Sequence, residues 1–395
     1  MGRMGLLLGV VGVLFVLAVG AALQPLLSPG EETPVADAGP FAEGQAPLTV
    51  EEIGELSVTE LLTASPNEAR EVIAAADEVK TTFESCEKDG VPGLKVRTTC
   101  VTAKTRALAI SAGDIGIFDS IGRFEDLSSV DITGGQLADL SALAAYPGLK
   151  QLILMRVQIA DLSAVSQLTG LNRLVVKGIP DFDLRLISGL QGLTELSLIG
   201  VTAPDLEPIA ALPQLQSLDL NTAQIGDFSA LSRMTGLTFL NLNETNITDI
   251  APLAMMPDLT RLGFVDTAVS DLSPLAKSVK LEHLHFDGAR VTDVSALRDL
   301  VKLTVLHIDQ NAITDISALA GMTRLSWLDL HDTQITSIAP LAEMKELSRL
   351  DLSGTRVTDL SPLAGLERLH TLDITNTSIT DLSPVEGRDR LQIKQ

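Results

Sequence analysis

The sequence predicts an α/β solenoid in which one short strand and one short helical turn recur along the chain. Two observations lead to this fold class. A 22-residue phrase recurs thirteen times from about Leu108 to Val385 without an insertion. Each copy also keeps its apolar residues at the same positions, as at Leu350 and Leu352 in the clearest copy. A fixed period in the twenties is typical of stacked repeats, because one unit cannot bury its own apolar face.

Every copy contains its strand and its helical turn in the same order. Leu350-Asp-Leu352 alternates with a period of two, which is typical of a half-buried strand. Stacked copies of this strand predict a parallel sheet. The segment from Asp359 to Leu363 predicts a short helical turn, because Asp accepts backbone N–H groups at a helix start and proline is tolerated in the first turn.

The repeat resembles the 22-residue leucine-rich repeats of the internalin-like bacterial proteins, over residues 108–385. The resemblance implies a curved solenoid with parallel strands on the concave face and short helical turns on the convex face. The sequence departs from the family at the corner after the strand, where the usual Asn is kept at Asn311. Threonine, whose hydroxyl has less reach, replaces that Asn at Thr245, Thr267, Thr333, Thr355 and Thr377.

The chain divides into four expected parts, of which the first two concern export. Residues 1–27 have the basic residue Arg3 near their start and continue as an apolar run, so we expect a signal peptide or a transmembrane anchor. The run is long enough to span a bilayer, whereas Ala21-Ala22 offers a weak cleavage site. Residues 28–47 are a proline-containing linker. We therefore expect a periplasmic or extracellular protein, anchored in the inner membrane by its N-terminal helix.

Residues 48–107 predict a small helical N-terminal cap, and residues 108–395 form the repeat domain. Two amphipathic stretches, 48–64 and 66–83, suggest the helices of the cap. Cys86 and Cys100 follow, and a cysteine pair in an exported segment most simply forms a disulfide. Thirteen residues separate the two cysteines, a spacing that fits neither the short metal-binding nor the short redox motifs.

The acidity of the chain has a structural explanation. The formal net charge is −22, and Asp recurs at the helix-capping position in eleven of the thirteen copies, from Asp139 to Asp381. The acidic balance argues against nucleic-acid and anionic-lipid partners, which need Lys and Arg. No nucleophile elbow, Walker loop, dinucleotide-binding glycine motif or zinc-protease motif occurs. We therefore expect a non-catalytic monomer without a cofactor.

The strand positions that point away from the core are free of packing constraints, so they carry the candidate site. Four of the five histidines and the sole tryptophan fall on such positions in three neighbouring copies. Exposed Trp and Arg are enriched at binding hot spots. We therefore predict a partner-binding site on the concave face, formed by His283, His285, His307, Asp309, Trp327, Asp329, His331, Arg349, Phe239 and Arg261.

Two other interpretations of these residues stay open. They could form a polar ladder whose His and Asp side chains satisfy one another. They could also hold a metal ion through His285, His307, Asp329 and Asp309, although a ladder places ligands in a flat row and not in a tetrahedron. The favoured function is an exported or membrane-anchored scaffold that binds a protein or peptide, and the alternative is a structural envelope spacer without a dedicated ligand.

The repeats also differ in regularity along the chain. From Leu240 onward nearly every copy has Thr or Ser before its capping Asp, whereas the same site varies in the earlier copies. We therefore expect less uniform convex loops in the first half, with a possible apolar patch of Ile153, Val175 and Ile199 on its concave face.

Overall fold

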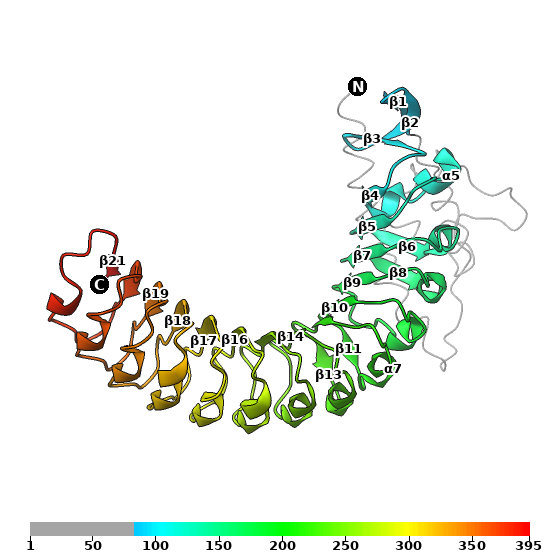
Figure 1. The fold of residues 1–395 in the computed structure, drawn as a ribbon. Coiled ribbons are helices and arrows are strands. Elements are labelled where there is room, and N and C mark those ends of the chain that lie inside the picture. The colour runs from blue at the N-terminus through cyan, green and yellow to red at the C-terminus, as the bar shows by residue number, and fades with distance from the viewer. Residues whose placement is uncertain (1–82) are drawn as a thin grey trace, which may run out of the picture. The chain divides into compact units, whose positions relative to one another are not determined.

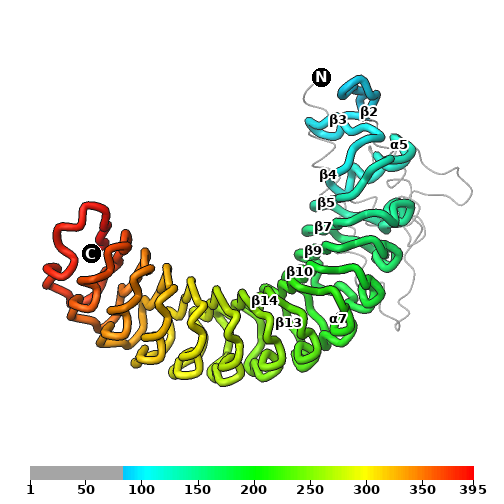
Figure 2. The backbone as a smooth tube through the Cα atoms, viewed as in Figure 1, coloured from blue at the N-terminus to red at the C-terminus, as the bar shows by residue number. Residues whose placement is uncertain are grey.

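The computed structural model describes residues 83–395, which form one unit. This unit is a curved solenoid, with the main strands along its inner, concave side and the helical turns along its outer side (Figure 1). Each repeat is one coil of the chain (Figure 2). The predicted solenoid is thereby confirmed. The predicted signal or anchor at 1–27, the linker at 28–47 and nearly all of the two amphipathic stretches lie outside the described residues.

One 14-stranded parallel sheet runs the length of the solenoid. Neighbouring strands are in register at a spacing of 22 residues, as in the pair Leu306 and Leu328. The last pair joins Leu372 to Ile393, so the final spacing is one residue shorter. In chain order the strands are β4 (Ala107–Ile110), β5 (Ser129–Thr133), β7 (Gln151–Met155), β9 (Arg173–Lys177), β10 (Glu195–Ile199), β12 (Ser217–Asp219), β14 (Phe239–Asn241), β15 (Arg261–Gly263), β16 (His283–His285), β17 (Val305–His307), β18 (Trp327–Asp329), β19 (Arg349–Asp351), β20 (Thr371–Asp373) and β21 (Gln392–Lys394).

The helical turns are short, and most of them are 3₁₀ helices. They are η2 (Ala112–Asp114), α5 (Ile117–Ile121), α6 (Ser141–Ala144), η3 (Ser163–Gln167), η4 (Leu184–Ile187), α7 (Glu207–Ala210), η5 (Ser229–Arg233), η6 (Ala251–Met255), η7 (Ser273–Lys277), η8 (Ser295–Leu297), η9 (Ser317–Gly321), η10 (Ala339–Leu341), η11 (Ser361–Leu363) and η12 (Ser383–Val385).

The recurring Asp residues cap these turns, as the sequence predicts. Each carboxylate accepts a hydrogen bond from the backbone N–H two residues further on, at 2.7–2.9 Å. In the copy that has Ser337 instead, the hydroxyl oxygen accepts from the backbone N–H of Ala339 at 3.3 Å. The eleven capping residues are Asp139, Asp161, Asp183, Asp205, Asp227, Asp249, Asp271, Asp293, Asp315, Asp359 and Asp381.

The core is a continuous column of aliphatic side chains between the sheet and the helical turns. Aromatic rings also occur in this core, and two of them, Phe264 and Phe286, stack with centroids 5.4 Å apart and planes 7° from parallel. At the corner after the strand, threonine hydroxyls donate to the carbonyl three residues back, as Thr333 does to Leu330 at 2.7 Å. The reach of threonine therefore stays within its own repeat.

Asn311 reaches further than the threonines at the same corner. Its side-chain nitrogen donates to the Phe286 carbonyl in the preceding repeat at 2.9 Å, and to the Asp309 carbonyl in its own repeat at 3.0 Å. Its side-chain oxygen accepts from the backbone N–H of Val291 at 3.0 Å. This buried amide therefore clamps the repeat of β16 to the repeat of β17.

A second recurring corner requires a left-handed backbone. Twelve successive copies have a positive φ at the same position, which Gly occupies in five of them and larger residues in seven. Thr222, with a φ of 58°, is the β-branched residue among them. The position recurs at Gly134, Arg156, Gly178, Gly200, Thr222, Glu244, Asp266, Gly288, Gln310, Asp332, Gly354 and Asn376.

The two halves of the solenoid differ in the length of their main strands and in their extra strand pairs. The main strands have four or five residues as far as β10 and three from β12 onward. The first half also contains two extra ladders, β6 (Gln136–Asp139) with β8 (Gln158–Asp161), and β11 (Thr202–Ala203) with β13 (Gln224–Ile225).

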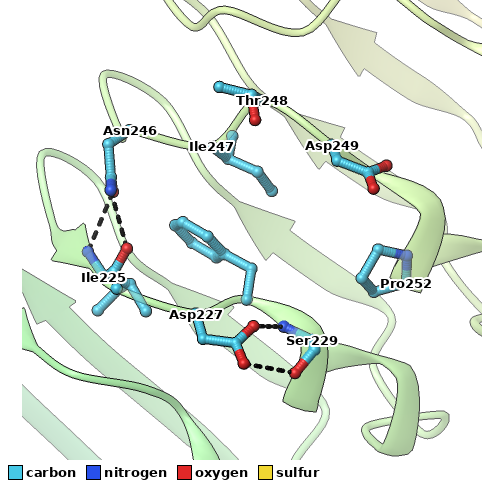
Figure 3. Close-up of a pocket in the computed structure, with 10 residues that line it drawn as sticks. Ile225, Asp227, Ser229, Asn246, Ile247, Thr248, Asp249 and Pro252 are labelled. Carbon is cyan, nitrogen blue, oxygen red and sulfur yellow. Dashed lines mark hydrogen bonds between the residues drawn. The ribbon is translucent and has the colours of Figure 1, made fainter.

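The second ladder ends at a pocket of about 260 Å³. There the side chain of Asn246 bonds to Ile225 as a further strand would, donating to its carbonyl at 2.8 Å and accepting from its N–H at 3.0 Å (Figure 3). Asp227, which also lines the pocket, accepts from the backbone N–H of Ser229. The polar side chains of this pocket are thus used by the fold itself.

The part of the predicted helical cap that the structure describes is a β-sheet, so that prediction is wrong for these residues. Strands β1 (Glu84–Lys88), β2 (Val91–Val96) and β3 (Thr99–Thr102) form an antiparallel sheet. The predicted disulfide between Cys86 and Cys100 joins β1 to β3, with the Cα atoms 5.9 Å apart. A Cβ atom on Gly93 of β2 would lie 2.3 Å from the carbonyl oxygen of Val101, so this tight closure requires glycine.

The N-terminal sheet is part of the core of the solenoid. Val96 and Val101 are 3% and 2% exposed and belong to the same buried cluster as Leu108 of β4. The two stretches expected to be helical, 48–64 and 66–83, precede this sheet and lie almost wholly outside the described residues. Within residues 83–395, no helix combines the length and the apolar character that a bilayer crossing demands.

Candidate functional site

The candidate site is built from alternate residues of each strand, repeated at the same positions on the neighbouring strands. Side chains at such positions point to the same face, and the parallel register repeats them on the next strand about 4.8 Å away. His285, His307 and Asp329 are partners in this register. The site therefore occupies the concave side of β16 to β19, which Figure 1 shows in the C-terminal half.

Three rings and a guanidinium group form one row across these strands, which we call the aromatic row: His285, His307, Trp327 and Arg349. The centroids of the His285 and His307 rings are 4.3 Å apart, and those of His307 and Trp327 are 4.4 Å apart, both edge-on. The guanidinium carbon of Arg349 lies 5.0 Å from the Trp327 ring centroid, within cation–π range. Trp327 remains 36% exposed, so a large preordered ring faces the groove.

A second group, which we call the paired triad, consists of Asp309, Asp329 and His331. The Nδ1 atom of His331 donates to Asp329 at 2.9 Å, and its Nε2 atom lies 3.3 Å from a carboxylate oxygen of Asp309. Asp309 is 4% exposed and also accepts a hydrogen bond from Gln310 at 3.4 Å. These residues satisfy one another, which is the polar ladder that the sequence allowed.

A third group, which we call the unpaired triad, consists of His285, Asp287 and His307. One possible ligand atom from each lies within 4.8 Å of the others. Among residues 83–395, two buried side-chain polar atoms have no hydrogen-bond partner: the oxygen Asp287 Oδ1 and the nitrogen His307 Nε2. Such atoms are rare in folded proteins, because burial without a partner forfeits the hydration of the group.

Burial sets the protonation of the concave face. It lowers the pKa of His285 to about 4, with the neighbouring His307 acting in the same direction, and it lowers the pKa of His307 as well. Burial, followed by the adjacent Asp309 carboxyl, raises the pKa of Asp287 to about 9. At neutral pH the unpaired triad therefore consists of two neutral imidazoles and a neutral carboxyl group.

The pKa of the histidine in the paired triad shifts in the opposite direction from those of His285 and His307. Burial opposes the charge of His331, but the hydrogen bond that His331 donates to Asp329 and the nearby carboxylates outweigh it and raise the pKa of His331. Burial raises the pKa of Asp329, which its hydrogen bonds with His331 partly offset. Two imidazole groups on adjacent strands thus titrate in opposite directions, according to whether a carboxylate holds them.

The remaining predicted residues lie beside this centre. His283 and Arg261 are register partners at the starts of β16 and β15, and Phe239 begins β14. Burial, followed by the charge of Arg261, lowers the pKa of His283. These three residues extend the same face away from the aromatic row.

Sequence reasoning missed Asp287 and Gln310 as members of the site. Asp287 could have been included, because it follows His285 by two residues and so points to the same face. The structure also alters the predicted apolar patch of the first half. Ile153 and Val175 are register partners, but the partner of Val175 on β10 is Ser197, whereas Ile199 pairs with Lys177.

Known proteins share the repeat and its fold. Family models described as "Leucine Rich repeats (2 copies)" and "Leucine rich repeat" match residues 323–365 and 345–387, and residues 280–335. The crystal structure of an internalin from Listeria monocytogenes is 26% identical, with a TM-score of 0.66 over 75% of this chain and 90% of that one. No curated protein matches the sequence.

Two more distant structures share the fold alone. A leucine-rich repeat protein of Leptospira interrogans is 18% identical, with a TM-score of 0.58 over 70% of this chain and 80% of that one. The ectodomain of a membrane receptor kinase from Arabidopsis thaliana, solved in complex with Casparian strip integrity factor 2, is also 18% identical. Its TM-score is 0.58 over 73% of this chain and 39% of that one.

The repeat and the fold define a leucine-rich repeat protein. Among such proteins the chain is internalin-like, since its solenoid matches nearly the whole length of the Listeria internalin.

Proposed function

We propose that this protein is an exported leucine-rich repeat scaffold that binds a protein or peptide ligand through its concave face and catalyses no reaction. The observation that carries the proposal is Trp327, a large ring that is 36% exposed yet held in place by His307 and Arg349. Tryptophan and arginine are the residue types that dominate binding hot spots. A ring already ordered in the free protein loses little entropy when a ligand covers it.

The fold of the solenoid supports the same proposal. Stacked repeats create an extended concave surface that many partners can match. The Arabidopsis receptor ectodomain, which shares this fold, was solved with a bound ligand. The Cys86–Cys100 disulfide is typical of exported proteins. We propose that residues 1–27 direct this export and, if they are retained, anchor the chain in the inner membrane with the repeats outside.

A capture experiment with matched surface variants tests the proposal. The full chain, Trp327→Ala and Met255→Ala are immobilised and exposed to an envelope extract of the source organism. Met255 is the control because it is 58% exposed at the end of η6, on the helical side of the solenoid. We expect one protein or peptide to be retained by the wild type and by Met255→Ala, and lost with Trp327→Ala. Retention by none of the three would favour a structural spacer, and equal retention by all three would show that Trp327 is not part of the interface.

A further inference from the structure

The unpaired triad brings three metal-binding side chains together, and one of them, Asp287, also forms a hydrogen bond with the Asp309 carboxyl. His285 and Asp287 are two residues apart on one strand and its extension, so both point into the concave groove, and His307 lies beside His285 on the next strand. One ligand atom from each residue lies within 4.8 Å of the others. No hydrogen bond reaches Asp287 Oδ1 or His307 Nε2 among the described residues, although both atoms are buried.

The paired triad next to it shows that this arrangement is not a general property of the concave face. There the imidazole of His331 lies between the carboxylates of Asp309 and Asp329 and contacts both. The same residue types on the next strands thus form a closed network. In the unpaired triad, by contrast, one atom of Asp287 and one of His307 are buried without a hydrogen-bond partner among the described residues.

The placement of Asp287 removes the geometric objection to a metal at this face. A single column of side chains would put His285, His307 and Asp329 in a flat row. Asp287 belongs to the neighbouring column, so the three donors form a triangle across two strands. Tetrahedral zinc, with bonds of about 2.0–2.1 Å, separates its ligand atoms by about 3.4 Å. The three ligand atoms, which lie within 4.8 Å of one another, would move closer together on binding.

We propose that His285, Asp287 and His307 bind one divalent transition-metal ion of the zinc class on the concave face. Binding would release the proton of the Asp287 carboxyl, and two imidazoles and the resulting carboxylate suit such ions, whereas calcium and magnesium prefer oxygen ligands alone. Three protein ligands leave a fourth position open towards the groove. The site goes beyond ligand capture by Trp327, and its test needs no partner protein.

The framework beneath the triad is suited to holding a metal ion. Phe286, which lies between His285 and Asp287, stacks on Phe264, and its carbonyl accepts a hydrogen bond from Asn311. Asn311 also bonds to the carbonyl of Asp309, two residues beyond His307. The two strands that supply the ligands are therefore fixed to each other by a buried amide, which keeps the donor positions constant.

The sole tryptophan provides a direct reporter for this site. The Trp327 ring lies 4.4 Å from the His307 ring, so a paramagnetic ion bound to His307 should quench its emission. The full chain is prepared without a histidine tag, treated with a chelator and titrated with Co²⁺. We expect saturable quenching with one ion per chain, reversed when Zn²⁺ displaces the cobalt and unaffected by Mg²⁺ or Ca²⁺. Calorimetric titration with Zn²⁺ provides the affinity and an independent stoichiometry.

Four variants decide where the ion binds. His285→Ala and Asp287→Ala should each weaken Zn²⁺ binding by more than about 100-fold, since even outer-shell partners of a metal site are worth 10–100-fold. Both changes leave the His307–Trp327 contact in place, so the optical signal stays valid. His283→Ala and His331→Ala, which remove histidines outside the triad, should retain wild-type affinity. Circular dichroism confirms that each variant is folded. Absence of saturable binding, or binding that survives in both His285→Ala and Asp287→Ala, would overturn the proposal.

Discussion

The indole ring of Trp327 packs edge-on against the imidazole of His307, with centroids 4.4 Å apart and planes at 62°. His307 in turn packs against His285, and Arg349 covers the other side of the indole. This row joins two neighbouring functions of the concave face. Trp327 is the exposed ring of this row, and we propose that a ligand binds there. The two histidines are its half-buried rings, and we propose that they bind a metal ion together with Asp287.

Asp287→Asn should raise the stability of the metal-free protein. The Asp287 carboxyl is buried beside Asp309 and has a raised pKa, so it must take up a proton when the chain folds at pH 7; an amide of the same shape avoids that cost and keeps a hydrogen-bond donor towards Asp309. We expect a higher unfolding temperature in the presence of a chelator at pH 7. Asp351→Asn is the control, because the Asp351 side chain is paired with Ser353 and an amide oxygen can keep that bond. A drop in stability with Asp287→Asn would show that the carboxylate is a structural partner.

Asn311→Ala should destabilise the solenoid by about 2–4 kcal/mol, because it leaves the buried Val291 N–H without a partner and takes one of two hydrogen bonds from the Phe286 carbonyl. The substitution removes the bonds to the Phe286 carbonyl and to the Val291 N–H at once. Thr333→Ala, which removes one bond within a single repeat, should cost about 1 kcal/mol. Denaturant titration of both variants measures the difference. Similar costs would mean that the bond between repeats contributes nothing beyond a local one.

The capping aspartates should make the solenoid sensitive to acid. Hydrogen bonds from Ser361 lower the pKa of Asp359, and those from Ser295 and Ser383 do the same at Asp293 and Asp381. A lowered folded-state pKa contributes stability that is present above the unfolded value of about 4 and is lost as the pH falls through the folded value.

Replacing Asp293, Asp359 and Asp381 with Asn should therefore flatten the acid response. Asn can accept the same backbone hydrogen bond but does not titrate. The unfolding temperature, measured from pH 7 down to about pH 2.5, should fall less steeply for the triple variant than for the wild type. Equal slopes would assign the acid sensitivity to other carboxylates.

Thr222→Gly should stabilise the chain by about 1 kcal/mol. Thr222 has a φ of 58°, and left-handed geometry costs residues with a Cβ about 1–2 kcal/mol, which glycine avoids at a smaller entropic cost. The reverse change at the equivalent position, Gly288→Ala, should destabilise, since the new Cβ would lie 2.3 Å from a side-chain oxygen of Asp266. Chemical denaturation of the two variants should show shifts of opposite sign.

The repeat spacing predicted the solenoid, its parallel sheet and its caps, because each depends on residues at fixed intervals within one copy. The left-handed corner stayed hidden, since seven of its twelve positions hold residues as different as Arg156 and Glu244. Their conformation follows from the path of the chain and not from side-chain preference. The sheet at 84–102 was also missed, because its pairing is antiparallel and outside the period.

The candidate site was predicted in composition but not in its internal division. The 22-residue register predicted that His285, His307, Trp327 and His331 lie on one face, and it also predicted which residue lies beside each of them on the next strand. The spacing does not predict which imidazole contacts carboxylates: His331 lies against Asp309 and Asp329, whereas His307 Nε2 has no hydrogen-bond partner among the described residues. The absence of partners at Asp287 and His307, on which the metal proposal rests, has no counterpart in residue spacing.

The clamp made by Asn311 joins the repeats of β16 and β17 and no others. Stacked repeats contact only their neighbours, so the geometry of the His285–His307 pair is determined within a two-repeat block. Such a block should keep its geometry when it is moved to another solenoid with the same period. Inserted into another leucine-rich repeat protein with the same 22-residue period, it would bring its ligand spacing with it, so this part of the surface could be moved between scaffolds without redesign.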